Sequence, residues 1–344
     1  MSARFEILPR NGDGAPWDAF VAQAEGSTFC HRAAWGNVLR DTLGAECRDL
    51  VALDDSGAIR GVLPLARVRS LMFGDYLVSL PFLNAGGPIG AAPACEQLTE
   101  RAAALARQLG VDLLELRTRD APPSDAVQIV ARKLTVRLPL PASAAQLWES
   151  FPAKLRSQIK RAQKEGLVAR FGLEQRPAFY EVFARHMRDL GTPALPLGFF
   201  EQVAQRFSDL VVFGVVYRGL EPVAAGCGFV WRGELEITWA SALRAHQRVA
   251  PNMQLYWAFM EHAVSRGVQV FDFGRCTPGG GTHHFKRQWG GADVPLPWAQ
   301  WSPRGLSATP SPERPVYRAA AAVWQRLPLF VTKRLGPALA RRLP

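Results

Sequence analysis

The sequence predicts an α/β (α+β) protein with mixed sheets, built from two similar units in tandem. Two observations support this fold class. The 344 residues, 48% of them hydrophobic, suffice for two cores at about 150 residues per domain. In addition, a helix-strand pattern and a strand-turn-strand pattern each occur twice, in the same order.

The repeat is clearest in the two helix-strand segments. Residues 96–118 align without a gap on residues 253–275 when Gly110 is placed on Gly267. Each copy has apolar residues at helical spacing, reaches Gly-Val and continues as an alternating strand. Upstream, residues 50–68 and residues 211–231 both have the pattern of strand, polar turn and strand. Recurrence of both parts in one order indicates a duplicated unit.

Proline and serine mark the expected boundaries. The turn at 139–143 ends the first unit, which is expected over residues 1–143, with the second over 144–300. Residues 301–344 are predicted to form a Pro- and Ser-rich flexible linker and a basic tail. The tail pattern predicts short amphipathic helices, broken at Pro328 and Pro337. It lacks acidic residues and carries Arg318, Arg326, Lys333, Arg334, Arg341 and Arg342.

Charge and cysteine content narrow the class of protein. Lys and Arg total 41 against 30 Asp and Glu, a net charge of +11 that favours nucleic acid, anionic lipid or a phosphate-bearing substrate as partner. No signal-like start and no run of about 18 apolar residues occurs, so a cytoplasmic protein is expected. The five cysteines are widely spaced and without a C-x-x-C pair, which is typical of reduced thiols rather than of a disulfide framework or zinc site.

A basic helix is predicted at the start of the second unit, over residues 154–170. Its apolar stripe is Leu155, Ile159 and Ala162, and one acidic residue offsets its cations. Such an imbalance favours recognition of an anion, although a solvated helix face is the alternative. The cations are Lys154, Arg156, Lys160, Arg161 and Lys164.

The segment "FDFGRCTPGGGTHHFKRQWG", residues 271–290, is predicted to be a buried strand followed by a glycine-rich loop. Glycines 279–281 allow the backbone to approach a ligand, or simply form a hairpin end. Lys286 lies between the aromatic residues Phe285 and Trp289, where it can stabilise negative charge on a carbonyl or phosphate oxygen. An exposed lysine on a terminal hairpin is the alternative.

The same segment offers candidates for a base. Asp272 and His284 are both placed to accept a proton, although Asp272 can equally be a structural partner of Arg275. Because adjacent histidines in a strand point to opposite faces, only one of them is expected to reach a given site. Cys276 and the two histidines provide too few ligands for a metal and no orienting group for a thiol nucleophile.

In the first unit, residues 84–88 (Asn-Ala-Gly-Gly-Pro) precede a predicted helix. A glycine-rich turn at a helix N-terminus can bind an anion. A tight turn without a ligand explains the pattern equally well.

Taken together, the duplicated unit, the basic "KLRSQIKRAQKEG" and the ending "FDFGR…GGG…FKRQWG" resemble the FemABX-like family, whose members consist of two tandem GNAT-type acyltransferase domains. The resemblance covers most of residues 29–298. With its tail "VWQRLPLFVTKRLGPALARRLP", the chain is similar, more narrowly, to FemAB-related proteins associated with exosortase and PEP-CTERM exopolysaccharide loci.

The resemblance implies transfer of an acyl or aminoacyl group to an amine of a cell-envelope precursor, without a tightly bound cofactor. Phe285 and Lys286 match the family's Phe-Lys pair, so Lys286 is expected to assist the ester end of the donor, with His284 and Asp272 as the other catalytic candidates. The expected donor- and substrate-binding residues are Lys154, Arg156, Lys160, Arg161, Arg248, Arg275, Gly279, Gly280, Gly281, Phe285 and Trp289.

The donor stays open between aminoacyl-tRNA and acyl-CoA. The family's long coiled-coil arm is not visible in the sequence. The GNAT pyrophosphate loop falls on "QRVAPNM", where Arg248 matches but Pro251 and Met253 replace small residues.

Three function hypotheses follow. They are an acyl or aminoacyl transferase acting on a phosphate-bearing or lipid-linked precursor, an acyl-CoA-dependent N-acyltransferase acting on a sugar amine, and a non-catalytic subunit peripheral to the inner membrane. The last rests on the tail, whose Trp324, Leu327 and Phe330 suit a membrane interface.

Overall fold

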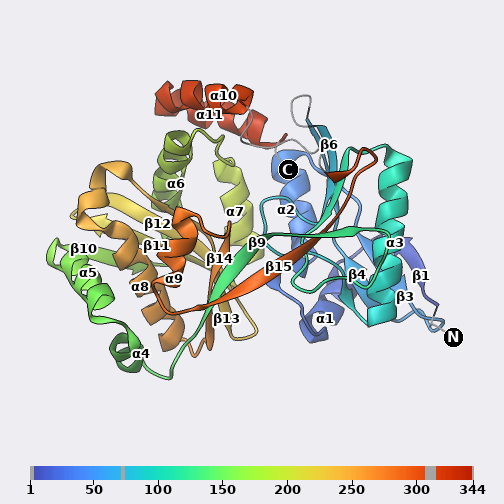
Figure 1. Ribbon diagram of the computed structural model, residues 1–344, viewed down its shortest axis with the longest axis horizontal. Helices are drawn as coiled ribbons and strands as arrows, with labels where there is room; N and C mark the ends of the chain where they lie inside the picture. The colour runs from blue at the N-terminus through green and yellow to red at the C-terminus, as the bar shows by residue number, and fades with distance from the viewer. Residues whose placement is uncertain (1–3, 71–73, 307–314, 343–344) are drawn as a thin grey trace. The chain divides into compact units, whose positions relative to one another are not determined.

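The computed structural model describes residues 4–70, 74–306 and 315–342 (Figure 1). Contacts divide the chain into two units. Unit 1 comprises residues 1–133, 295–314 and 338–344, and unit 2 comprises residues 134–294 and 315–337. Both units combine helices with sheets of mixed type, which confirms the predicted fold class.

The two units divide after residues 133 and 294, earlier than the expected boundaries at 143 and 300. The reason is that one strand runs through each of these two divisions. Strand β9 (Gln128–Pro139) begins in unit 1, but its residues 134–139 pair with β14 (Val270–Cys276) of unit 2. Strand β15 (Ala292–Trp301) returns to unit 1, where its last residues pair with β8 (Leu113–Leu116). Of the expected flexible connector, residues 307–314 lie outside the described residues.

The sheet of unit 2 has the order β10-β11-β12-β13-β14-β9. All neighbours are antiparallel except β13 and β14, which are parallel and are connected through helix α8. The remaining strands are β10 (Leu167–Phe171), β11 (Val211–Arg218), β12 (Glu221–Trp231) and β13 (Glu234–Ala242). The helices are α4 (Ala144–Ser150), α5 (Ala153–Lys164), α6 (Arg176–Leu190), α7 (Leu197–Arg206), α8 (Pro251–Ser265) and α9 (Gly281–Arg287), with short 3-10 turns at Leu173–Gln175 and Arg244–Val249.

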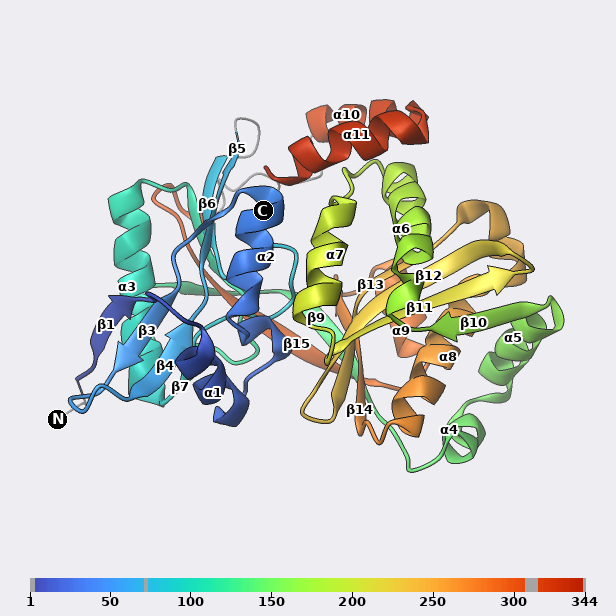
Figure 2. The same cartoon turned by 180° about the vertical axis from the view of Figure 1, so that it is seen from behind.

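Helices cover both faces of this sheet, as two adjacent residues of β11 show. The ring of Phe213 packs edge-on against Phe179 of α6, with centroids 5.3 Å apart. A Cβ at Gly214, pointing the other way, would lie 2.6 Å from the Phe259 ring of α8. Figure 1 shows α8 in front of the sheet, and Figure 2, seen from behind, shows α6 and α7. The core of unit 2 therefore has two halves, one on each face of the sheet.

Unit 1 repeats the parallel strand pair with a connecting helix. Strands β6 (Gly74–Val78) and β8 are parallel, and α3 (Ala92–Leu109) precedes β8 as α8 precedes β14. The sheet continues with β5 (Ala66–Ser70) and β2 (Glu46–Cys47). A second, antiparallel sheet has the order β1-β3-β4-β7, from Glu6–Pro9, Leu50–Leu53, Ile59–Leu63 and Ile89–Gly90. Helices α1 (Ala15–Gln23) and α2 (Ala34–Leu43) and a 3-10 turn at Phe29–His31 complete the unit.

Two local predictions are wrong in detail. The basic helix ends at Lys164 rather than at Arg170, because Gly166 takes a positive φ of 75° and residues from 167 onward join the sheet as β10. The stretch expected to be a glycine-rich loop up to residue 290 is helical over Gly281–Arg287. The histidines therefore occupy adjacent positions of a helix, not of a strand.

In the tail, α10 (Pro315–Arg326) and α11 (Leu329–Ala340) are separated at Pro328 as predicted. Pro337 does not break α11, contrary to the prediction. Trp324 is 8% exposed, so it does not face a membrane as expected, whereas Phe330 is 73% exposed. Among the described residues, no helix is long and apolar enough to cross a membrane. The five cysteines are free thiols.

Candidate active site

The candidate site lies where the two parallel strands of unit 2 separate. Strands β13 and β14 pair only over a short stretch, in which Glu234–Glu236 lies beside Val270–Asp272. Beyond that point β13 continues beside β12, while β14 shifts register between Asp272 and Arg275 and stays paired with β9. Gly274 takes a φ of +70° in this irregularity, which a residue with a Cβ adopts only at a cost. The ladder between β13 and β14 therefore ends at Asp272.

Two carboxylates mark the end of the shared ladder. Glu236 and Asp272 are register partners on neighbouring strands and are 3% and 2% exposed. The Asp272 Oδ1 accepts the Gly274 N–H at 2.7 Å and the Thr135 hydroxyl. The Thr238 hydroxyl donates to Glu236 Oε1 at 3.0 Å. Each of these buried carboxylates thus has a hydrogen-bond donor within the protein.

Lys286 of α9 supplies a cation beside them. Its side chain is 4% exposed, and its Nζ donates to the carbonyl oxygens of Gly274 and Arg275 at 2.6 and 2.9 Å. Burial lowers the pKa of Lys286, while negative charge at Cys276, Asp272 and Glu236 acts in the opposite direction. A lysine ammonium has three donors, and two are accounted for by backbone carbonyls. Lys286 is thus a buried side chain held by two backbone carbonyls rather than an exposed hairpin lysine.

Phe285 and Trp289 hold α9 in place. Trp289 is 1% exposed and packs edge-on against Phe151 at 5.5 Å, and Phe285 packs against Tyr256 at 5.0 Å. These are contacts of the hydrophobic core. The aromatic residues that flank Lys286 in sequence therefore desolvate it and fix its helix. The buried Trp289 Nε1 has no hydrogen-bond partner among the described residues.

The two histidines of α9 differ in their contacts. His283 Nδ1 accepts the Gly279 N–H at 3.0 Å, and its Nε2 lies 3.0 Å from Asp293 Oδ1. His283 thus connects the glycine turn to the chain after the helix. The His284 side chain is exposed, and helical spacing directs it away from Lys286, two residues later. The structure does not bring His284 to the buried cluster.

Two of the three glycines at the start of α9, Gly279 and Gly281, border open space. A Cβ at Gly279 or Gly281 would meet no atom within 4 Å, and Gly279 takes a φ of 73°. Gly280 is the N-cap of the helix. Glycine is required by backbone conformation at 279, and the turn borders free space rather than packed side chains.

The basic residues of α5 divide into two groups. Leu155, Ile159 and Ala162 are buried, which confirms the predicted apolar stripe. Arg156 pairs with Glu149 at 2.7 Å, and Lys160 lies over the Trp148 ring at 5.7 Å. Lys154, Lys164 and Arg161 are exposed.

Arg161 connects the basic helix to the start of α8. Its guanidinium donates to the carbonyl oxygen of Arg248, two residues before the N-cap Ala250. Arg248 is exposed, and α8 begins at Pro251 without a side-chain cap. Pro251 and Met253 are both buried, so the bulky residues of the "QRVAPNM" loop point into the core. Helix N-termini attract anions, and two arginines accompany this one.

Comparisons with known proteins support this view of unit 2. Residues 149–287 match the family model described as an acetyltransferase (GNAT) domain. The matched residues lie within unit 2. No curated protein matches the sequence.

Solved structures resemble the whole chain. A crystal structure of FemX is similar over 86% of this chain and 97% of its own, with a TM-score of 0.61 and 13% identity. The C-terminal domain of a putative lysylphosphatidylglycerol synthetase from Agrobacterium fabrum gives a TM-score of 0.55 at 13% identity, covering 90% of this chain and 94% of its own. A tandem GNAT protein from the clavulanic acid biosynthesis pathway gives a TM-score of 0.56 at 12% identity, covering 87% of this chain and 98% of its own. The chain has the fold of tandem GNAT proteins.

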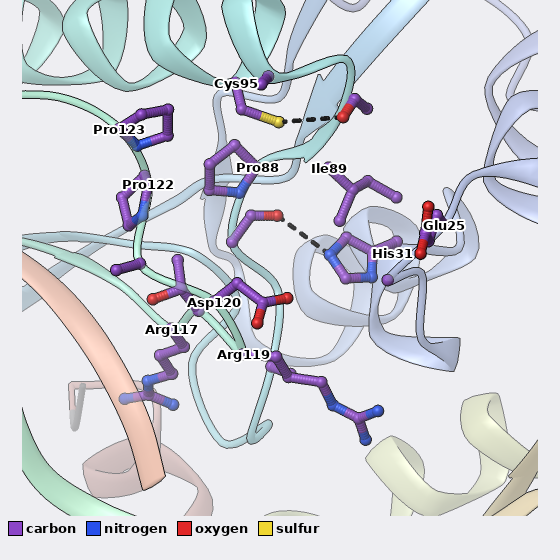
Figure 3. A pocket seen from close by; sticks show the side chains of 17 residues that line it. Glu25, His31, Pro88, Ile89, Cys95, Arg117, Arg119, Asp120, Pro122 and Pro123 are labelled. Atoms are coloured by element: carbon purple, nitrogen blue, oxygen red, sulfur yellow. Dashed lines mark hydrogen bonds between the residues drawn. The ribbon is translucent and has the colours of Figure 1, made fainter.

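Unit 1 has a cavity at the corresponding place, the start of α3 (Figure 3). Its volume is about 220 Å³, and its lining includes His31, Pro88, Cys95 and Asp120. The glycines of the preceding turn are explained by packing: a Cβ at Gly87 would lie 2.4 Å from Thr118 Cγ2. The structure therefore favours the ligand-free explanation of the 84–88 turn.

His31 fixes this turn. Its Nδ1 accepts the Thr28 N–H at 3.0 Å and its Nε2 lies 3.0 Å from the Gly87 carbonyl oxygen, as the dashed line in Figure 3 shows. Because Nδ1 accepts, the ring proton is on Nε2 and donates to Gly87. Burial lowers the pKa of His31 to about 4.

Sequence reasoning missed Glu236 and Thr135, which lie beside Asp272. Glu236 lies in the alternating stretch "GELEIT", and alternation alone does not show that it pairs with Asp272. Thr135 lies more than a hundred residues before its partner. Among the described residues, no group of three or more His, Cys, Asp or Glu side chains could hold a metal ion.

Proposed function

We propose that the protein transfers an acyl or aminoacyl group from an activated ester or thioester donor to an amine of a cell-envelope precursor, related to peptidoglycan or exopolysaccharide. The observation that carries this proposal is the position of Lys286, buried beside Asp272 and Glu236 where the two parallel strands separate. The proposal places the reaction in the cytoplasm.

The donor binds with its phosphate group at the start of α8. Because Pro251 has no N–H, the first backbone N–H of the uncapped N-terminus is that of Asn252, and Arg161 and Arg248 provide positive charge. Exposed Lys154 lies on the same basic helix and adds to the attraction for anions. The reactive carbonyl then extends into the opening between β13 and β14.

Transfer proceeds by direct attack of the amine. The neutral nitrogen forms a bond to the carbonyl carbon, and the carbonyl oxygen becomes an oxyanion that the Lys286 ammonium stabilises. The intermediate collapses by breaking the bond to the leaving alcohol or thiol, which takes up the proton that the amine loses. Asp272 and Glu236 keep Lys286 charged, and no covalent intermediate with the protein is needed.

The neighbouring structures favour an envelope-related reaction. FemX and the putative lysylphosphatidylglycerol synthetase share the fold, and the name of the latter describes synthesis of an aminoacylated lipid. An association with exosortase and PEP-CTERM exopolysaccharide systems is part of the proposal and rests on the sequence resemblance alone.

A second candidate is an acyl-CoA-dependent N-acyltransferase acting on a sugar amine. The match of residues 149–287 to an acetyltransferase domain favours it. So does the size of the helices: among the described residues 134–294, none exceeds the 15 residues of α6 and α8, so no coiled-coil arm is present to hold a tRNA.

A competition experiment distinguishes the two donors. The purified protein is titrated with a fluorescent aminoacyl-minihelix RNA and then challenged with acyl-CoA and with CoA. Binding that needs the aminoacyl group and resists CoA supports aminoacyl transfer, whereas displacement by acyl-CoA supports the second candidate. Binding of neither donor would overturn both.

The same titration tests the phosphate site. Arg161→Gln should weaken donor binding about tenfold, because a charge-assisted contact is lost. The matched control is Lys164→Gln, an exposed cation of the same helix. Equal affinities of the two variants would remove Arg161 from its assigned role.

A further inference from the structure

Each tail helix has a buried face and an exposed face, and the two faces differ in chemistry. No acidic residue occurs from residue 315 to the end of the sequence. In α11 the buried residues Thr332, Gly336 and Ala340 recur every four positions and form one stripe. Phe330 and Arg334 are exposed and lie on the opposite side of the helix.

The inner faces are fitted closely to unit 2. A Cβ at Gly191, at the end of α6, would lie 2.7 Å from Ala321 of α10, and one at Gly336 of α11 would lie 3.2 Å from the backbone of Ala194. Lys333 donates to Glu181 of α6. Both tail helices therefore pack against α6 and the connection that follows it, so their opposite faces both point away from unit 2.

The outer faces combine exposed apolar and cationic side chains. We call this surface the tail face and define it by Arg318, Val323, Arg326, Phe330, Arg334 and Leu335. Phe330, Val323 and Leu335 are 73%, 59% and 49% exposed. Phe330 is the most exposed of these three side chains.

The arginines of the tail face are not used within the protein. Arg318, Arg326 and Arg334 are exposed and form no ion pair with any described residue, whereas Lys333 on the inner side is paired. An apolar surface interleaved with unpaired cations and free of acids is complementary to the headgroup region of an anionic bilayer. Leucine, valine and phenylalanine enter the acyl boundary, and arginines contact lipid phosphates.

We propose that the tail face docks unit 2 on an anionic phospholipid surface. The helices lie in the plane of the interface and are already folded against α6, so binding does not require them to become ordered. Trp324 is buried, so it holds α10 against the protein and does not enter the membrane. The proposal goes beyond the proposed transferase function and does not depend on it.

Flotation of the full chain with vesicles tests the proposal. Vesicles of phosphatidylcholine alone are compared with vesicles in which part of it is replaced by phosphatidylglycerol. The protein should bind only the second kind, and binding should weaken as salt is added. Arg326→Glu with Arg334→Glu should lower the partition coefficient more than fivefold, since each basic residue near an anionic surface contributes about that factor.

Matched variants separate the tail face from general charge and apolarity. Phe330→Ser should weaken binding, whereas Leu220→Ser, which alters a side chain 93% exposed elsewhere on unit 2, should not. Arg266→Glu is the charge control, at an exposed position after α8. Lys286→Met should bind vesicles like the unchanged protein whether or not it is active.

Three results would overturn the proposal. One is equal binding of the tail-face variants and the controls. Another is binding of both kinds of vesicle alike. The third is tail-dependent binding of a minihelix RNA with no binding to anionic vesicles, which would assign the arginines to nucleic acid.

Discussion

Lys286 combines burial with a defined set of partners. Its Nζ contacts two backbone carbonyls, and its neighbours include two buried carboxylates. Burial lowers the pKa of Lys286, and the negative charge of the carboxylates opposes that shift. A charge placed in this way acts on a developing oxyanion without reorganising, which is the condition for a large electrostatic contribution.

Lys286→Met should lower kcat about a hundredfold, because the side chain keeps its volume and loses its charge. The KM for donor should change little, since the phosphate site is formed by other residues. Steady-state kinetics with Lys164→Met as control give the comparison, and thermal unfolding checks that the variant folds. A kcat within twofold of the unchanged protein would contradict the assignment.

His31 makes unit 1 sensitive to acid. Its pKa of about 4 lies below the ordinary 6.5, so between these values the unfolded chain binds more protons than the folded one. Stability from this residue is therefore complete above pH 6.5 and is lost as the pH falls toward 4. The loss amounts to about 3 kcal/mol.

The measurement is urea unfolding of the protein and of the His31→Gln variant at several pH values. The stability advantage of the unchanged protein over this variant should shrink by about 3 kcal/mol from pH 6.5 to pH 4. Other titrating groups are common to both chains. A difference that is constant with pH would show that His31 is not held neutral.

At the scale of elements, short turns decide how the helices present their ends. Helix α9 follows a glycine turn that His283 holds, and it brings Lys286 to the core. Helix α8 follows Ala250, whose φ of 53° is left-handed. This strained residue is fixed next to the carbonyl that Arg161 binds. The start of α8 is thereby kept in one geometry, as a phosphate site requires.

Ala250→Gly should stabilise unit 2 by about 1 kcal/mol, because glycine adopts the left-handed conformation without the cost that a Cβ imposes. Ala178→Gly, inside α6 with ordinary helical geometry, should instead destabilise by about 1 kcal/mol. Chemical denaturation of both variants measures the contrast. Destabilisation by Ala250→Gly of the size seen for Ala178→Gly would show that Ala250 is not strained.

At the scale of the whole molecule, each unit is completed by chain from elsewhere in the sequence. Ala299, Gln300 and Trp301 of β15 pair with Leu116, Glu115 and Leu114 of β8. Ala299 is fully buried in the core of unit 1, and Gln300 Nε2 donates to Glu115 at 2.8 Å. Unit 1 therefore needs residues far from its own continuous segment.

A fragment of residues 1–133 should not fold stably alone, because β8 would expose the edge that β15 covers. Circular dichroism and thermal unfolding should show little cooperative structure. Addition of a peptide of residues 295–306 should restore it in part. A cooperative transition of the fragment alone, at the temperature seen for unit 1 in the full chain, would contradict this expectation.

Much of the fold was predictable because it depends on local periodicity. The apolar stripe of α5, the glycines ending α3 and α8, and the repeated helix-strand pairs are written in nearby residues. The helix α9 was missed because Gly280 and Gly281 favour a loop, while the packing of Phe285 and Lys286 that stabilises the helix comes from distant residues. Tertiary packing overrode local preference there.

The sequence by itself determined the class of fold, the duplication, the basic helix and Lys286 as a candidate. Only the tertiary structure decided which charges meet: Glu236 beside Asp272, Thr135 on that carboxylate, Arg161 on the carbonyl of Arg248, and His284 away from them all. The physical reason is that helix and strand periodicity act over a few residues, whereas a buried charge is stabilised by partners that strand register and helix packing bring together from across the chain.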